Sequence, residues 1–266
     1  RIGDKIQISL EAKEIVFYCL TNTGNGKSNF DVEFFDENEI KVSSKQQDVL
    51  NSSVSTVFFS SVDIPDDATF FKVNTDSENI KYEIYIQGIS VVVPVYKAEK
   101  HIIQLLNTLH QQTLDRKLFD VKFVLNGEKD NSANVIQEFL QQHPELKATV
   151  LYADVAGASH ARNVGIKALD KEYCVFLDAD DELSPNYLKN LLSVASENSI
   201  IFSNIKDVSN GNFAQSLLVN KTILEKENCA VTVNDVNSLV TMIACKLIPS
   251  FYMKGIQFHE ELKSGE

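Results

Sequence analysis

Four carboxylates fall within five positions of one short stretch, VFLDADDELS, at residues 175–184. They are Asp178, Asp180, Asp181 and Glu182, and they directly follow an apolar run with the character of a strand. Carboxylates this close repel one another unless water solvates them or they share a cation. The stretch therefore indicates either a solvated loop that leads into a helix or part of a site for a divalent metal ion.

Two further apolar runs end in side chains that could hold a nucleotide. ISVVVPVY, residues 89–96, ends in Pro94 and Tyr96, and VKFVL, residues 121–125, is followed by Asn126. The carboxyl ends of parallel strands meet at one edge of a sheet, so we expect these side chains to converge with the acidic stretch. A ring, an amide and carboxylates there could bind a base, a ribose and a metal-bound diphosphate. Taken singly, each feature has an ordinary explanation. Tyr96 could be an aromatic residue at the rim of the sheet, Asn126 part of a turn, and the acidic stretch a solvated loop before a helix.

The elements that must position these strand ends alternate along the chain after residue 88. Strand-like runs at 89–96, 121–125, 148–153, 173–177 and 199–205 are separated by helix-like segments at 100–111, 131–143, 159–169 and 185–197. This order predicts an α/β domain with a mostly parallel central sheet. Residues 204–248 are less regular and carry no prediction.

Residues 1–88 have a different texture, with short alternating runs broken by polar turns. This pattern predicts a small all-β, sandwich-like domain. We therefore place a domain boundary at residue 88, with a β-rich accessory domain at 1–88 and the α/β domain at 89–266. For the accessory domain we favour a role in packing or interaction, including oligomerisation, over a role in glycan binding.

The composition narrows the classes of partner. A formal net charge of −12 argues against a nucleic-acid binder or an anionic-membrane binder, since both need basic surface. No apolar run reaches the length of a transmembrane span, although the chain begins with Arg1 rather than Met. The four cysteines are scattered along the chain, at Cys19, Cys174, Cys229 and Cys245. Scattered cysteines favour a reducing, cytoplasmic location, and peripheral attachment to the inner face of a membrane is an alternative.

Four blocks in order, ISVVVPVYKAEKHIIQLLNTLHQQTL, VKFVLNGEKDNS, GASHARNVGIKAL and YCVFLDADDELSPNYL, resemble the inverting family-2 glycosyltransferases with the GT-A fold. The resemblance is close over residues 89–188 and returns at 244–266. It implies transfer of a sugar from a nucleotide-sugar, with a UDP-sugar favoured, to a glycan or other hydroxyl acceptor in cell-surface polysaccharide synthesis. It also implies Mn²⁺ or Mg²⁺ as cofactor.

The resemblance assigns the nucleotide-binding residues position by position. Pro94 and Tyr96 would line the base pocket, with Glu99 as a further contact, and Arg162 would lie near the base and the diphosphate. The family usually has two acidic or amide residues before the glycine that follows the second strand. Here the first of these positions is Leu125, so only Asn126 remains. A second departure, at residue 97, is a lysine where asparagine is common.

The resemblance also divides the acidic stretch. Asp178 and Asp180 match the DxD motif and are the residues expected at the metal. Asp178 would bind the nucleotide side, the ribose or a metal-bound water, and Asp180 would bind the metal itself. Asp181 and Glu182 are expected to start the following loop and helix rather than to bind the ion.

The catalytic base is expected close to the last residue of the sequence. In the family, the Gly-Glu in this context is followed by Asp, and this acidic pair supplies the base. Glu266 would therefore lie beside the base, and the domain would be incomplete at its C-terminal end. His259, Glu260 and Glu261 are nearby polar candidates. The alternative function is a non-catalytic nucleotide-sugar-binding fragment, inactive because the base lies beyond Glu266. A nucleotidyltransferase is less favoured, since PVYKAEK lacks the glycine-rich loop of that class.

Overall fold

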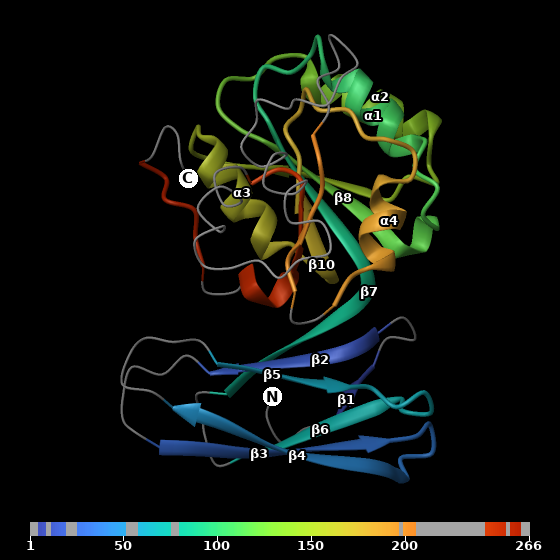
Figure 1. Cartoon of the computed structure of the whole chain (residues 1–266), viewed down its shortest axis with the longest axis vertical. Helices are drawn as coiled ribbons and strands as arrows, with labels where there is room; N and C mark the ends of the chain where they lie inside the picture. Colours follow the sequence, from blue (N-terminus) through green and yellow to red (C-terminus); the bar gives the residue numbers. More distant parts are fainter. Residues whose placement is uncertain are drawn as a thin grey trace. The chain divides into compact units, whose positions relative to one another are not determined.

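The computed structural model describes residues 5–8, 12–19, 26–51, 58–75, 80–196, 199–205, 243–253 and 256–261 (Figure 1). It divides into two compact units, Arg1–Gln87 and Gly88–Glu266. One long strand, β7 (Ile80–Val95), contributes its first part to the first unit and its second part to the second. Within the described ranges, no helix is both long enough and apolar enough to cross a bilayer.

The first unit is an antiparallel β-sandwich. One sheet has the order β1-β6-β3-β4, and in the other β2 lies between β5 and the first part of β7. Side chains from both sheets, including Ile15, Val62, Phe34 and Phe71, are buried in one shared core. This confirms the predicted small all-β domain. The strand bounds are β1 (Ile6–Gln7), β2 (Ala12–Cys19), β3 (Gly26–Phe35), β4 (Lys41–Asn51), β5 (Phe58–Asp63) and β6 (Phe70–Thr75).

The second unit has a mixed sheet with the order β11-β12-β10-β7-β8-β9. Strands β7, β8 and β9 are parallel neighbours, and β12 runs antiparallel to β10 and β11. This confirms the predicted α/β domain with a mostly parallel sheet. Its elements are β8 (Phe119–Leu125), β9 (Ala148–Tyr152), β10 (Lys171–Phe176), β11 (Ile201–Phe202), β12 (Lys246–Pro249), α1 (Ile102–His110), α2 (Ser132–Gln142), α3 (Ala158–Lys167) and α4 (Tyr187–Ser193).

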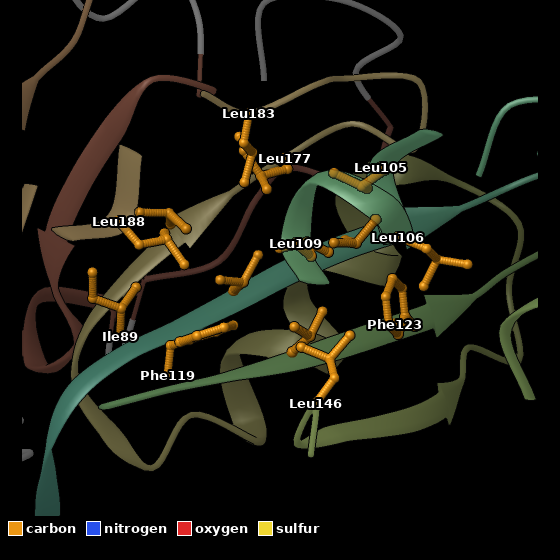
Figure 2. Close-up of a cluster of buried hydrophobic side chains, with 14 of the residues drawn as sticks. Ile89, Leu105, Leu106, Leu109, Phe119, Phe123, Leu146, Leu177, Leu183 and Leu188 are labelled. Carbon is orange, nitrogen blue, oxygen red and sulfur yellow. The ribbon is translucent and has the colours of Figure 1, made fainter. Parts of the chain in front are cut away.

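Alternation along β7 sends its side chains into two separate cores. Ile89, Val91 and Val93 pack with the helices α1, α2 and α4, in the cluster shown in Figure 2. Val92 points to the opposite face and packs with α3. A strand covered on both faces reads as a continuous apolar run, which is why residues 89–95 lack polar alternation. Each fully buried aliphatic side chain contributes about 1.5–3 kcal/mol to folding.

A glycine sets how closely α3 approaches the sheet. A Cβ atom on Gly165 would lie only 2.4 Å from Cγ1 of Val92, so any larger residue would force the helix away. Gly165 therefore fixes the height of α3, and with it the position of Arg162 one turn earlier in the same helix.

Candidate functional site

A cavity of about 490 Å³ opens at the carboxyl ends of β7, β8 and β10. The structure brings together five of the predicted residues in its lining: Pro94, Tyr96, Asn126, Asp178 and Asp180. The rest of the lining was not predicted from the sequence, although Lys97 was noted as a departure from the family. It consists of Lys97, Ala98, His101, Ala156, Gly157, Ala158 and Ala179. All of these except Ala156 lie in the family blocks quoted above, so the resemblance offered a signal for them. The roles of the five predicted residues stay predictions.

The exposed ring of Tyr96 is supported by a glycine at the end of β8. Gly127 has φ of +71°, and a Cβ atom there would lie 2.8 Å from Cε2 of Tyr96. Lys97 also adopts a left-handed conformation, with φ of +47°, and its ammonium forms a 2.6 Å ion pair with Glu128. Asparagine adopts this conformation more readily than lysine, which explains why asparagine is common at this position. The Lys97 ammonium lies 5.3 Å from the centre of the Tyr96 ring.

The loop that follows β7 is held by the start of α2. The backbone N–H of Ala98 donates to Ser132 Oγ at 3.0 Å, and that of Glu99 donates to Asp130 Oδ2 at 3.3 Å. The Glu99 carboxylate in turn accepts a hydrogen bond from the N–H of Asn131 at 3.1 Å. Glu99 does not belong to the cavity lining, so its observed contacts order the loop, and its contact with a nucleobase stays a prediction.

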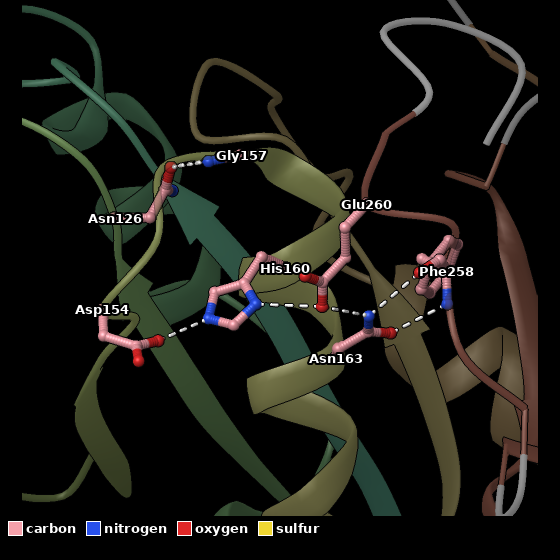
Figure 3. A network of polar contacts seen from close by, with 7 residues as sticks. All are labelled: Asn126, Asp154, Gly157, His160, Asn163, Phe258 and Glu260. Atoms are coloured by element: carbon pink, nitrogen blue, oxygen red, sulfur yellow. Dashed lines mark hydrogen bonds and ion pairs between the residues drawn. The ribbon is translucent and has the colours of Figure 1, made fainter.

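The Asn126 side chain is buried, and backbone groups occupy both ends of its amide. Nδ2 donates to the carbonyl of Val95 at 3.0 Å, and Oδ1 accepts from the N–H of Gly157 at 3.2 Å (Figure 3). The side chain thereby ties the end of β7 to the start of α3. Asn126 forms part of the cavity wall, and these two bonds compete with the predicted contact to a base edge.

The acidic stretch folds so that its carboxylates take different directions. Asp178 donates its N–H to Oδ2 of Asp181 at 2.9 Å, and the N–H of Asp181 donates back to the Asp178 carbonyl at 3.1 Å. Burial raises the pKa of Asp181. Asp178 and Asp180 are exposed at the cavity. Asp181 therefore organises the turn, in agreement with its predicted role, and two carboxylates remain to face a ligand.

Arg162 lies beneath the cavity rather than in its lining. Its side chain is buried, and Nη2 donates to Oδ1 of Asp178 at 3.2 Å. Its guanidinium also lies 5.6 Å from the centre of the Phe258 ring. Arg162 thus orients Asp178 and offsets part of the negative charge, while a direct contact with a diphosphate stays a prediction.

A polar network joins α3 to the segment at residues 256–261 (Figure 3). His160 Nε2 lies 2.7 Å from Asp154 Oδ1, and Nδ1 lies 2.9 Å from Glu260 Oε1. Glu260 and then Asp154 raise the pKa of His160 by these contacts. Asn163 donates to the Phe258 carbonyl at 3.0 Å and accepts from the Phe258 N–H at 2.8 Å. His160 and Asn163 therefore tie α3 to the segment at residues 256–261.

The predicted base region is described only in part. Glu266 lies outside the described residues. Glu260 is bonded to His160 and to Asn163, and these hydrogen bonds lower the pKa of its carboxyl. A carboxylate with a lowered pKa is a weaker base, so Glu260 is poorly suited to accept a proton. His259 and Glu261 are exposed.

Comparisons with known proteins agree with this arrangement. The chain is 29% identical over 182 residues to the poly(ribitol-phosphate) beta-N-acetylglucosaminyltransferase TarS of Staphylococcus aureus, a match covering 66% of this chain and 30% of TarS. It is 26% identical over 183 residues to the minor teichoic acid biosynthesis protein GgaB of Bacillus subtilis, covering 66% of this chain and 20% of GgaB. The chain therefore spans about a third or less of the length of these relatives.

A crystal structure of S. aureus TarS superimposes with a TM-score of 0.56 and 26% identity, covering 67% of this chain and 52% of that one. This likeness confirms the GT-A-like fold. The model of the family described as Glycosyl transferase family 2 matches residues 90–236, more than half of the sequence. The resemblance drawn from the four sequence blocks is thereby confirmed, and the chain belongs to glycosyl transferase family 2.

Proposed function

We propose that this chain transfers a sugar from a UDP-sugar to a hydroxyl group of a cell-surface glycan, with inversion at the anomeric carbon. The observation that carries the proposal is the meeting of Tyr96, Asp178 and Asp180 on one cavity of about 490 Å³. That volume falls within the range of small-molecule sites. TarS crystal structures in complex with UDP and with UDP-GlcNAc, at 25% identity to this chain, support the choice of donor.

The acceptor is proposed to be a polymer of the teichoic acid class. TarS is named for transfer to poly(ribitol-phosphate), and GgaB is named for minor teichoic acid biosynthesis. Such a polymer carries free hydroxyls between phosphates, so it offers the nucleophile that the reaction needs.

The cavity walls suit the parts of a nucleotide-sugar. The exposed Tyr96 ring offers a face for stacking against a base, beside Pro94. Helix α3 begins at the cavity, at Gly157 and Ala158, and the positive end of its dipole favours a diphosphate. A second cavity of about 560 Å³ shares Lys97 and Asn126 with the first, and so extends the site along the carboxyl edge of the sheet.

The exposed carboxylates fit a hard divalent cation. Asp178 and Asp180 present oxygen donors at the cavity, and Mg²⁺ or Mn²⁺ binds through one or two carboxylates plus substrate phosphates. Such an ion, when bound, supplies charge stabilisation for the departing nucleoside diphosphate. Asp180 is the proposed principal ligand, and Asp178, held by Arg162, is the proposed contact on the nucleotide side.

The remaining step is removal of the proton from the attacking hydroxyl. Inversion requires attack from the face opposite the diphosphate, so the base stands across the sugar from Asp180. Glu260 is engaged by His160 and Asn163. We therefore keep Glu266 as the candidate that lies beside the base. The β-sandwich unit is proposed to serve packing or oligomerisation.

The test combines ligand binding with turnover. Thermal unfolding would be measured with UDP, GDP and CDP, each with and without Mn²⁺, and sugar transfer would be assayed on this chain and on a chain extended beyond Glu266. We expect stabilisation by UDP that depends on Mn²⁺, and transfer in at least the extended chain.

The outcomes separate the two candidate functions. Transfer by the extended chain but not by this chain would support the alternative, in which this fragment only binds the nucleotide-sugar because the base lies beyond Glu266. Binding of UDP with no transfer by either chain would contradict the proposed reaction. No stabilisation by any nucleotide with any metal would contradict the site itself.

A further inference from the structure

A second group of potential metal ligands lies outside the cavity lining, at the C-terminal ends of α1 and α2. Within the described ranges, His110, His143 and Glu145 form a group whose ligand atoms all lie within 4.8 Å of one another. Nδ1 of His110 is 3.2 Å from Oε1 of Glu145, and Nδ1 of His143 is 3.7 Å from the same oxygen. None of the three lines either cavity described above.

Packing between two helices brings these side chains together. His110 is the last residue of α1, and His143 directly follows α2. Their rings lie with centroids 4.1 Å apart and planes tilted by 41°. Both rings also contact Phe139, at centroid distances of 6.2 Å for His110 and 4.4 Å for His143. The two imidazoles are therefore held in place before any ion arrives, which lowers the ordering cost of binding.

Two imidazoles and one carboxylate are a donor set that zinc uses in proteins. Tetrahedral ligation at bond lengths of about 2.0–2.1 Å places ligand atoms about 3.3 Å apart, close to the two separations given above. The histidine side chains are 32% and 30% exposed and that of Glu145 is 47% exposed, so small rotations and a water in the fourth position are both possible. Nδ1 of His110 is shielded from solvent, and within the described residues its polar neighbour is the Glu145 carboxylate at 3.2 Å, with no hydrogen bond formed.

The local charges also favour a cation, with one opposing group. The C-terminal ends of α1 and α2 carry the negative ends of two helix dipoles, and Glu145 adds a carboxylate. Arg116 opposes a cation, but its guanidinium is engaged by the carbonyls of Leu109, at 3.2 Å, and of His110. Because Arg116 is held by these carbonyls, His110, His143 and Glu145 remain the groups that an ion at this position would contact.

We propose that His110, His143 and Glu145 form a binding site for a transition-metal cation of the Zn²⁺ class. The ion joins the C-terminal ends of α1 and α2, which contact each other in the core that covers one face of the sheet. It closes a loop between residues 110 and 143, so its expected effect is on stability rather than on sugar transfer.

Zn²⁺ binding to metal-free protein, measured by calorimetry and by the shift in Tm, tests this site. An Asp180→Asn background keeps the cavity carboxylates from contributing a second cation site. We expect one Zn²⁺ bound per chain at micromolar concentrations, with a rise in Tm of several degrees. His143→Phe retains a ring against Phe139 and removes the ligand, and Glu145→Gln removes the charge; either should weaken binding by about 100-fold or more.

His259→Ala is the matched control, because it removes an exposed histidine elsewhere and should leave the stoichiometry and the affinity unchanged. Co²⁺ in place of Zn²⁺ should give a visible absorption spectrum typical of nitrogen ligation, and this spectrum should be lost in His143→Phe. Unchanged Zn²⁺ affinity in His143→Phe and Glu145→Gln would overturn the proposal. So would the absence of Zn²⁺ binding to the protein with all three ligands intact.

Discussion

At the amino ends of the second unit's strands, which are the middle of β7 and the starts of β8 and β10, charged side chains pair with one another, and Asp120 and Lys122 are buried. At the carboxyl ends of the same strands, carboxylates are exposed around a cavity. Lys122 is buried at the amino ends, with Nζ 3.3 Å from Oδ2 of Asp120 and 3.6 Å from Oδ2 of Asp170. Ser90 donates a hydrogen bond to Asp170 at 3.3 Å. The negative charge of the carboxylates at these ends is therefore neutralised by a lysine of the protein itself.

At the carboxyl ends, Asp178 and Asp180 face the cavity, and the guanidinium of Arg162 approaches Asp178. Exposed carboxylates cost little in water, and they can be neutralised by a ligand that arrives from outside. The difference shows why acidic residues at a strand end are informative only when their partners are known. The same residue types stabilise the fold at one end of the sheet and are available for binding at the other.

Removal of the buried cation should give the largest effect on stability. Lys122→Met leaves the carboxylates of Asp120 and Asp170 together without their ammonium partner. We expect the free energy of unfolding, measured in urea at neutral pH, to fall by about 3 kcal/mol. Lys147→Met, which replaces an exposed lysine, should change it by less than about 0.5 kcal/mol. Equal effects of the two substitutions would show that the buried, paired Lys122 stabilises the fold no more than an exposed lysine does.

Acidification should stabilise the amino ends through one carboxyl group. Burial, with Asp170 nearby, raises the pKa of Asp120 to about 6. Aspartates of the unfolded chain titrate near pH 4, so the folded state binds this proton more tightly. The contribution of Asp120 to stability therefore rises as the pH falls from about 7 through 6 and is complete near pH 4. We expect a gain of about 3 kcal/mol from this group.

Urea unfolding at a series of pH values compares the protein with Asp120→Asn, which cannot take up the proton. The difference between the two free energies of unfolding should change between pH 7 and pH 5 in favour of the unaltered protein. A constant difference across that interval would show that Asp120 has an ordinary pKa.

A smaller change at the carboxyl ends should affect ligand binding as well as stability. Gly127→Ala places a methyl group against the Tyr96 ring and strains a left-handed backbone, so we expect a loss of about 1–2 kcal/mol in unfolding free energy. The displaced ring should also weaken UDP binding by about tenfold, measured by calorimetry. In a Tyr96→Ala background the effect on affinity should disappear. Persistence of that effect would mean that the ring does not contact the nucleotide.

The convergence of Tyr96, Asn126, Asp178 and Asp180 could be predicted from sequence, because continuous apolar runs alternating with helices place their carboxyl ends at one edge. How each side chain is used could not. The Asn126 amide pairs with backbone groups 31 residues away in either direction, and no local pattern encodes those partners. The same holds for Arg162, whose family position indicated a ligand contact but whose guanidinium donates a hydrogen bond to Asp178.

Other parts of the fold could not be predicted from sequence patterns, for different physical reasons. Strand β4 has the sequence KVSSKQQDVLN, in which polar residues interrupt the alternation that marks a half-buried strand. Gly88 indicated a break between domains, yet β7 continues through it with φ of +124°. The group of His110, His143 and Glu145 depends on the packing of two helix ends, and its residues have no motif spacing.

The central claim is that the carboxylates at the carboxyl ends take their neutralising charge from a bound cation, while those at the amino ends take it from the protein. UDP binding measured by calorimetry with and without Mn²⁺, in the protein, in Asp180→Asn and in Asp170→Asn, tests it most directly. The account predicts that Mn²⁺ tightens UDP binding at least about tenfold in the protein and in Asp170→Asn, and has no effect in Asp180→Asn, which keeps its full stability. Mn²⁺-dependent UDP binding that survives in Asp180→Asn would contradict it.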